Sequence, residues 1–184
     1  MKLFRNPVFA VFLALVVVIA STLINTNVKF GRKCRAVSDQ FYSGAVTRGA
    51  QDVSIASALE SICNDAEALC VVAEGCGTNA DSVRSEVQSL RSSMQFESMY
   101  LIRTAYSSLR SSLTTMLGQL AQKELSEQDA DTVSRCTASV AQAQDSISAS
   151  PYNETVRAFL RRYDHFPTNV LAELAGVEMP ESFS

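Results

Sequence analysis

The most continuous apolar stretch of the chain lies close to its beginning. The run PVFAVFLALVVVIASTLI extends from Pro7 to Ile24, and no charged residue follows before Lys29. At a helical rise of 1.5 Å per residue, the 18 residues of this run reach about 27 Å, close to the hydrocarbon thickness of a bilayer, roughly 30 Å. The pattern predicts a transmembrane anchor over residues 7–28, preceded by a short tail of residues 1–6.

The same run has a second interpretation, a cleaved signal peptide. Lys2 and Arg5 would then be the basic leader, and Val18-Ile19-Ala20 an acceptable cleavage site. The apolar core of a signal peptide usually has about 7–15 residues, and this run is longer. The length favours a retained single-pass anchor in the cell membrane, with the cleaved leader as the alternative.

Basic residues flank the predicted anchor on both sides. Lys2 and Arg5 precede it, and the juxtamembrane segment 29–35 carries Lys29, Arg32, Lys33 and Arg35. By the positive-inside rule, the larger group favours a cytoplasmic body. These four side chains are also predicted to lie at the membrane surface, where each contributes about 1 kcal/mol through anionic headgroups. Membrane lipid is therefore a predicted partner.

Beyond residue 36, apolar residues recur at steps of three and four, which is the period of an α-helix that buries one face. The first helix is expected to continue as far as Gly49. A second opens near Gln51 and ends at the glycines of EGCGT, Glu74 to Thr78, where Thr78 or Asn79 can cap the next helix. Its predicted core positions are Ile55, Leu59, Ile62, Ala66, Leu69 and Val72.

The pattern predicts an unusually long third helix. No proline interrupts residues 81–123, and 43 residues in one helix would form a rod of about 64 Å. Such a rod needs neighbours of similar length to cover its apolar stripe. The predicted stripe consists of Val83, Val87, Leu90, Met94, Leu101, Ala105, Leu109, Leu113, Met116 and Leu120.

A fourth helix is expected to begin at Ser126, which with Asp129 resembles a capping box. Its apolar positions follow heptad spacing, as in coiled coils, and Pro151 predicts a break near residues 149–152. The helix is expected to end at Phe166-Pro167, with Phe166 as its last core residue. Thr168 would then cap a short helix whose face of Val170, Leu171 and Leu174 covers the open end of the bundle.

These patterns together predict an all-α fold. An N-terminal transmembrane helix is followed by an elongated antiparallel bundle of three to four long helices, formed by residues 36–184. The formal net charge of −3 is unevenly distributed, because residues 36–184 carry ten basic and nineteen acidic residues. A body of this charge, without a basic stripe, argues against nucleic acid as a partner.

Few residues of the chain are candidates for chemistry. The five cysteines form no CxxC pair and are interpreted as small apolar core residues rather than as disulfides or a zinc site. His165 is the single histidine, beside Asp164, and the acidic residues at 124, 127, 129 and 131 are interpreted as a solvated helix cap. No nucleotide-binding, hydrolase or metalloprotease motif occurs. We therefore predict no catalytic, cofactor-binding or metal-binding residues.

The segment YNETVRAFLRRYDHFPTNVLAELAGVEMPESF, from Tyr152 to Phe183, resembles the C-terminal signature of the LemA family. Asp164 and Val177 depart from that signature, and the second-helix stretch typical of the family is not recognisable. The resemblance implies a divergent member, with a membrane helix followed by long helices and no catalytic mechanism. The matching positions, taken as structural, are Tyr152, Asn153, Val156, Tyr163, Phe166, Pro167, Asn169, Ala172, Gly176 and Phe183.

The lack of converging catalytic groups favours a non-enzymatic interaction or scaffold module that binds a protein partner or self-associates. The alternative is an enzyme or small-ligand binder whose site is formed from scattered Asp, Glu, Ser and Tyr residues.

Overall fold

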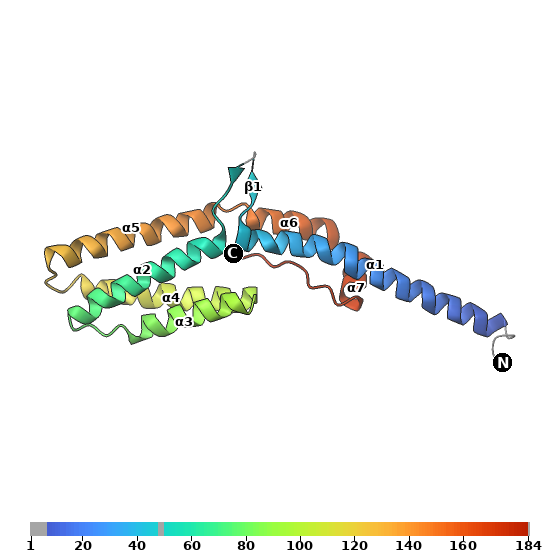
Figure 1. The fold of residues 1–184 in the computed structure, drawn as a ribbon, viewed down its shortest axis with the longest axis horizontal. Helices are drawn as coiled ribbons and strands as arrows, with labels where there is room; N and C mark the ends of the chain where they lie inside the picture. Colours follow the sequence, from blue (N-terminus) through green and yellow to red (C-terminus); the bar gives the residue numbers. More distant parts are fainter. Residues whose placement is uncertain (1–6, 48–49, 184) are drawn as a thin grey trace. The chain divides into compact units, whose positions relative to one another are not determined.

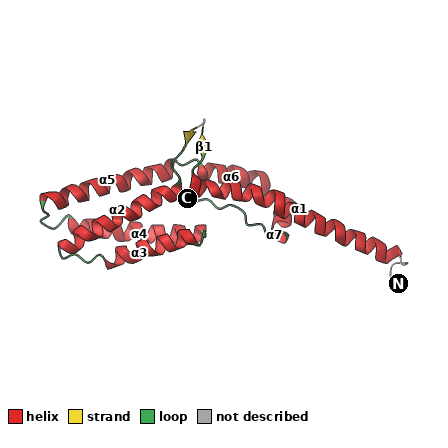
Figure 2. Cartoon of the chain, in the orientation of Figure 1, coloured by secondary structure: helices red, strands yellow, loops and turns green. Residues whose placement is uncertain are grey.

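The computed structural model describes residues 7–47 and 50–183, and helices dominate them, which confirms the all-α prediction (Figures 1 and 2). Two very short strands pair antiparallel, with Val46 opposite Gln51. The elements in chain order are α1 (Pro7–Ser43), β1 (Val46–Thr47), β2 (Ala50–Gln51), α2 (Ile55–Gly75), α3 (Asp81–Gln95), α4 (Met99–Leu120), α5 (Glu127–Ala149), α6 (Tyr152–Tyr163) and α7 (Thr168–Leu174).

The contacts divide the chain into two units. Unit 1 consists of Met1–Asp39 and Glu154–Glu181, and unit 2 consists of Gln40–Asn153 with Ser182–Ser184. Each unit is therefore built from segments that are far apart in the sequence. The candidate functional surface described below belongs to unit 1.

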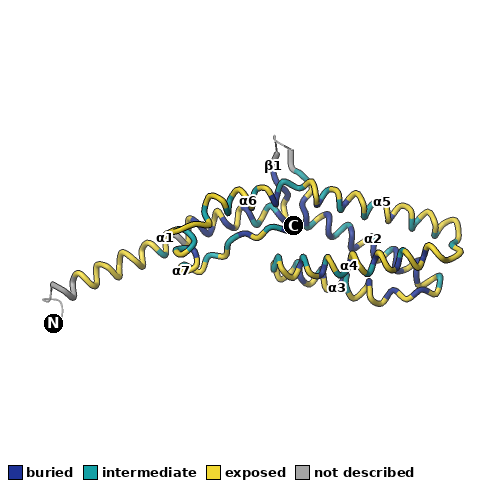
Figure 3. The backbone as a smooth tube through the Cα atoms, turned by 180° about the vertical axis from the view of Figure 1, so that it is seen from behind, coloured by how far each residue is buried: buried dark blue, intermediate teal, exposed yellow. Residues whose placement is uncertain are grey.

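Unit 2 contains a bundle of α2, α3, α4 and α5, in which successive helices run in opposite directions (Figure 1). α2 lies against α3, α4 and α5, and α3 lies against α4. The predicted apolar stripes form the core, since Leu59, Leu90 and Leu109 are fully buried. Figure 3 shows the same alternation of buried and exposed positions along each helix.

Local signals in the sequence mark several helix ends correctly. The Ser126 hydroxyl accepts the Asp129 backbone N–H at 3.2 Å and donates to the Asp129 carboxylate at 2.7 Å. α5 ends at Ala149 and α6 begins at Tyr152, so the predicted break at Pro151 is confirmed. Asn79 accepts the backbone N–H of Asp81 at 2.8 Å, although the N-cap residue of α3 is Ala80.

The prediction of one helix over residues 81–123 is wrong. The chain turns back at residues 96–98, where Glu97 has a φ of 56°, and α3 and α4 form a helical hairpin. Ile102, not the predicted Leu101, is buried at the start of α4, and Leu101 is exposed. The hairpin lets the stripes of α3 and α4 cover each other, whereas a single rod of about 64 Å would have required longer partners.

α1 also ends earlier than the sequence pattern suggested, at Ser43 rather than Gly49, which lies outside the described residues. Gly44 follows with a φ of 79°. A Cβ at this position would lie 2.0 Å from the Asp52 carbonyl oxygen, so the close approach of the two chain segments requires glycine.

The corner after α6 differs from its prediction in three respects. α6 ends at Tyr163, and Phe166 is 81% exposed, so Phe166 is not a core residue. Thr168 does not cap α7, because the N-cap residue is Pro167 and no side-chain cap bond forms. Val170 and Leu174 are exposed, and the buried residue of α7 is Ala172, whose small side chain permits close packing.

Candidate functional site

Over residues 7–47 and 50–183, no other segment of the chain covers most of the apolar part of α1. From Val11 to Ile24 the large apolar side chains are exposed, with Val11 at 70%, except for Leu23, which is half-buried (Figure 3). Among the described residues, α1 is the helix long and apolar enough to cross a membrane, with its most apolar window unburied. An exposed apolar patch of this extent is typical of a surface that contacts a membrane or another protein.

The hydroxyl groups within this stretch are satisfied by the helix itself. Ser21 Oγ donates to the Val17 carbonyl at 2.7 Å, and Thr22 Oγ1 donates to the Val18 carbonyl at 2.8 Å. Such bonds to the preceding turn are how transmembrane helices tolerate serine and threonine in the absence of water. The two polar residues are therefore compatible with an apolar environment.

The four predicted membrane-surface residues lie on the next turns of α1. Lys29, Arg32, Lys33 and Arg35 are all exposed. Lys33 Nζ lies 3.4 Å from the Tyr163 hydroxyl and 5.4 Å from the centroid of its ring. The salt bridges found in the described part of the chain involve Arg84 and Arg91 of α3. None of the four basic side chains on α1 takes part in these salt bridges.

α6 and α7 pack on this part of α1. Phe30 lies 5.8 Å from Phe159 and 5.3 Å from Tyr163 between ring centroids. Phe30 and Cys34 form a small core with Ala172 of α7. Asn27 Nδ2 donates to the Ala175 carbonyl at 2.7 Å, which ties the end of α7 to the turn of α1 that follows the apolar run.

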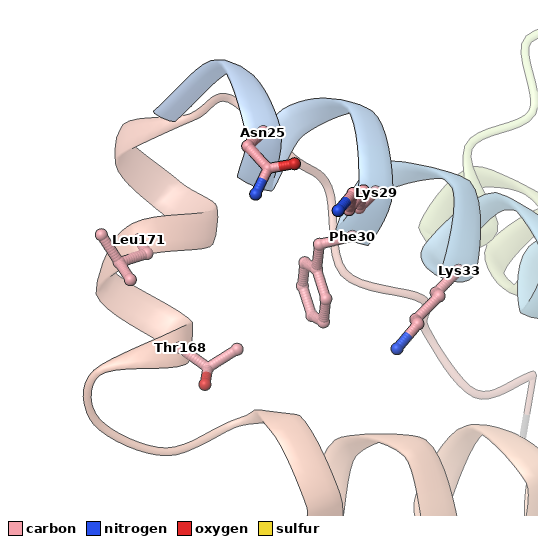
Figure 4. Close-up of a pocket in the computed structure, with 6 residues that line it drawn as sticks. All are labelled: Asn25, Lys29, Phe30, Lys33, Thr168 and Leu171. Carbon is pink, nitrogen blue, oxygen red and sulfur yellow. The ribbon is translucent and has the colours of Figure 1, made fainter. Parts of the chain in front are cut away.

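A pocket of about 220 Å³ lies between α1 and α7. Phe30 and Lys33 extend from α1 into this space, and Thr168 belongs to α7 (Figure 4). The remaining lining residues are Asn25, Lys29 and Leu171. The pocket therefore combines an apolar wall with two ammonium groups and lacks a carboxylate.

The residues of the LemA-like signature fall into two groups. In unit 2, Tyr152, Asn153 and Phe183 are buried, and Asn153 Oδ1 accepts the Phe183 backbone N–H at 2.7 Å. The Phe41 ring packs against both Tyr152 and Phe183, at 5.7 and 5.6 Å between centroids. This arrangement fixes the C-terminal end of the described chain.

The other signature residues belong to unit 1. Val156 and Ala172 are buried, Tyr163 and Asn169 are half-buried, and Phe166 and Pro167 are exposed. Gly176 has a φ of 66° and ends α7, where the Val177 N–H donates to the Ala172 carbonyl at 2.9 Å. The positive φ explains a glycine at this helix end.

The cysteines are free, and four of them, Cys34, Cys63, Cys70 and Cys136, are buried, as core residues should be. Burial raises the pKa of the Cys63 thiol to about 12 and also raises the pKa of Cys70 and Cys136. These three thiols are therefore protonated at neutral pH and are poor nucleophiles. Cys34 is likewise buried, with an exposed fraction of 2%.

The other candidates for chemistry are not assembled into a site. Asp164 and His165 are both exposed after the end of α6. Around the start of α5, the side chains of Glu124, Glu127 and Asp131 are exposed. The Asp129 carboxylate accepts a hydrogen bond from the Ser126 hydroxyl at the helix cap. Over residues 7–47 and 50–183, no group of three His, Cys, Asp or Glu side chains converges to hold a metal ion.

A charged network on α2 and α3 was not predicted from the sequence. The Arg91 guanidinium donates to Glu60 at 3.1 Å, to Asn64 at 2.8 Å and to Glu67 at 2.5 Å. The three partners lie at steps of four and three on one face of α2. This spacing is the sequence feature from which the network could have been predicted. The network ties α2 to α3 through charged groups that are partly exposed to solvent.

No family model, curated protein or solved structure matches this chain.

Proposed function

We propose that this protein is a single-pass membrane protein in which α1 holds a non-enzymatic helical interaction module at the membrane. The observation that carries the proposal is the run of exposed apolar side chains on α1, whose only hydroxyls bond within the helix. The cations that follow at Lys29, Arg32, Lys33 and Arg35 would meet anionic headgroups. We also propose that the protein is a divergent member of the LemA family, because residues 152–183 resemble the C-terminal signature of that family.

Extraction of membranes with alkaline carbonate tests the anchor. The full-length protein should remain in the membrane fraction, because more than twenty consecutive uncharged residues insert favourably. Sequencing of the mature N-terminus separates the anchor from a cleaved leader. A mature chain that begins at Ser21 in the soluble fraction would contradict the anchor.

Orientation has its own test. The positive-inside rule favours a cytoplasmic body, so protease added to intact cells should leave residues 36–184 uncut and should cut them after permeabilisation. Digestion in intact cells would reverse the assignment.

Affinity capture from detergent-solubilised membranes tests the interaction role. The module should recover a stoichiometric protein partner or a second copy of itself. Turnover of a small molecule by the purified body would instead support the alternative, an enzyme with a site formed from scattered polar residues.

A further inference from the structure

We propose that α7 and the turn before it form a second membrane contact, an interfacial foot that lies in the lipid headgroup region beside α1. We define the foot as residues 166–174. This inference rests on the proposed function, because the foot needs the membrane that α1 crosses. It assigns to the foot a lipid surface, not a protein, as its binding partner.

The first observation is the exposure of large apolar side chains. In the described part of unit 1, the large apolar side chains that are exposed outside α1 are Phe166, Val170 and Leu174, at 81%, 42% and 67%. They recur at steps of four, and Val170 and Leu174 lie about 160° around α7 from the buried Ala172, at about 100° per residue. One face of α7 thus packs on α1 while the opposite face is apolar and uncovered.

The second observation is the position of α7 along α1. Asn27 bonds to Ala175 at one end of α7, and Phe30 packs on Ala172 in its middle. Both contacts follow directly on the apolar run that ends at Ile24. If α1 crosses the bilayer, α7 lies where hydrocarbon gives way to headgroups.

The third observation is direction. α7 runs crosswise to α1, not alongside it (Figures 1 and 4). When α1 crosses a bilayer, α7 therefore lies along the membrane surface, the orientation of interfacial helices whose apolar face enters the boundary by about 5–10 Å.

The charges near the foot match a lipid surface. Lys29 and Lys33 line the pocket between α1 and α7, and Arg161 and Arg162 end α6. The acidic residues nearby in the sequence of unit 1 include Asp164, Glu173 and Glu178, and none of them lines the pocket. The ammonium groups of the pocket are thus placed to meet lipid phosphates, which are strong hydrogen-bond acceptors.

The test uses the absence of tryptophan from the chain. Full-length variants with one tryptophan each, Phe166→Trp, Phe12→Trp and Phe96→Trp, are placed in vesicles of phosphatidylcholine and phosphatidylglycerol. Phe12 reports on the anchor. Phe96 is a matched reference in unit 2, because it is 76% exposed at the corner between α3 and α4. Quenching is measured with aqueous acrylamide and with phosphatidylcholine brominated near the headgroup.

The emission of Phe166→Trp should shift to shorter wavelength in vesicles, lose most of its intensity to brominated lipid and resist acrylamide relative to Phe96→Trp. Emission of Phe166→Trp that is quenched by acrylamide and unaffected by brominated lipid would overturn the foot and leave the corner as a protein-docking surface. If Phe166→Trp gives this negative result while Phe12→Trp is quenched by brominated lipid, α1 contacts the bilayer and the foot does not. If Phe12→Trp also stays in water, the proposed function itself has failed.

Discussion

Phe166 and Phe183 occupy opposite environments within the same C-terminal segment. Phe183 is 6% exposed and contacts Phe41 and Tyr106, whereas Phe166 is 81% exposed. Phe183→Ala should therefore lower the free energy of unfolding by about 3 kcal/mol or more. Phe166→Ala should change it by less than about 0.5 kcal/mol in detergent. Thermal unfolding of the two variants provides the comparison, and equal losses would contradict the placement of both rings.

Cys63 is a buried residue whose protonation is coupled to the stability of the fold. Burial raises its pKa to about 12, while an unfolded cysteine titrates near 8.5. Between these values the unfolded chain releases the proton and the folded chain retains it, so stability falls as pH rises. Cys63→Ala should therefore lose less stability than the parent protein between about pH 9 and 12.

Denaturant unfolding at neutral and alkaline pH separates this titration effect from the packing cost of Cys63→Ala. The packing cost is present at both pH values, while the titration effect appears only on the alkaline side. Parallel pH profiles for parent and variant would show that the thiol is not buried as described.

At the scale of elements, the corner between α3 and α4 contains a residue in an unfavourable backbone conformation. Glu97 has a φ of 56°, in the left-handed region that side chains with a Cβ rarely adopt. Glu97→Gly should raise the free energy of unfolding by up to about 1 kcal/mol, because glycine adopts this conformation without strain.

A control at the same position distinguishes strain from charge. Glu97→Val removes the same carboxylate and adds a β-branched side chain, so it should destabilise the corner. Equal behaviour of the glycine and valine variants in thermal unfolding would mean that the charge, not the backbone conformation, determines the effect.

At the scale of the whole molecule, α1 has two roles along its length. Its first half is exposed and apolar, and its second half contributes buried residues to the folded protein, among them Phe30, Cys34 and Phe41. The candidate anchor and the packed part of the chain therefore share one continuous helix.

Two truncations test this division. A fragment of residues 29–184 and one of residues 36–184 should both leave the membrane fraction, because both lack the apolar run. Residues 29–184 retain Phe30 and Cys34 and should unfold at the higher temperature, as followed by circular dichroism at a helical wavelength. A 36–184 fragment of equal stability would show that the second half of α1 is dispensable for folding.

Much of the helical fold and part of the candidate site could be predicted from the sequence. The apolar run of α1, the Ser126 cap, the break at Pro151 and most core positions depend on interactions within a few residues, and such interactions appear as periodicity and as specific residue types. The basic residues at 29–35 were recognisable for the same reason, since their meaning depends only on the run before them.

Contacts between distant residues decided the rest. The reversal at Glu97 carries neither glycine nor proline and exists because α3 and α4 bury each other's stripes. The hydrogen bond from the Phe183 N–H to Asn153 joins residues that are 30 positions apart. Ala172 packs on α1, and this packing leaves Phe166, Val170 and Leu174 exposed. Helical periodicity shows which side chains share a face, but only the tertiary structure decides which of those faces meets another part of the chain and which remains exposed.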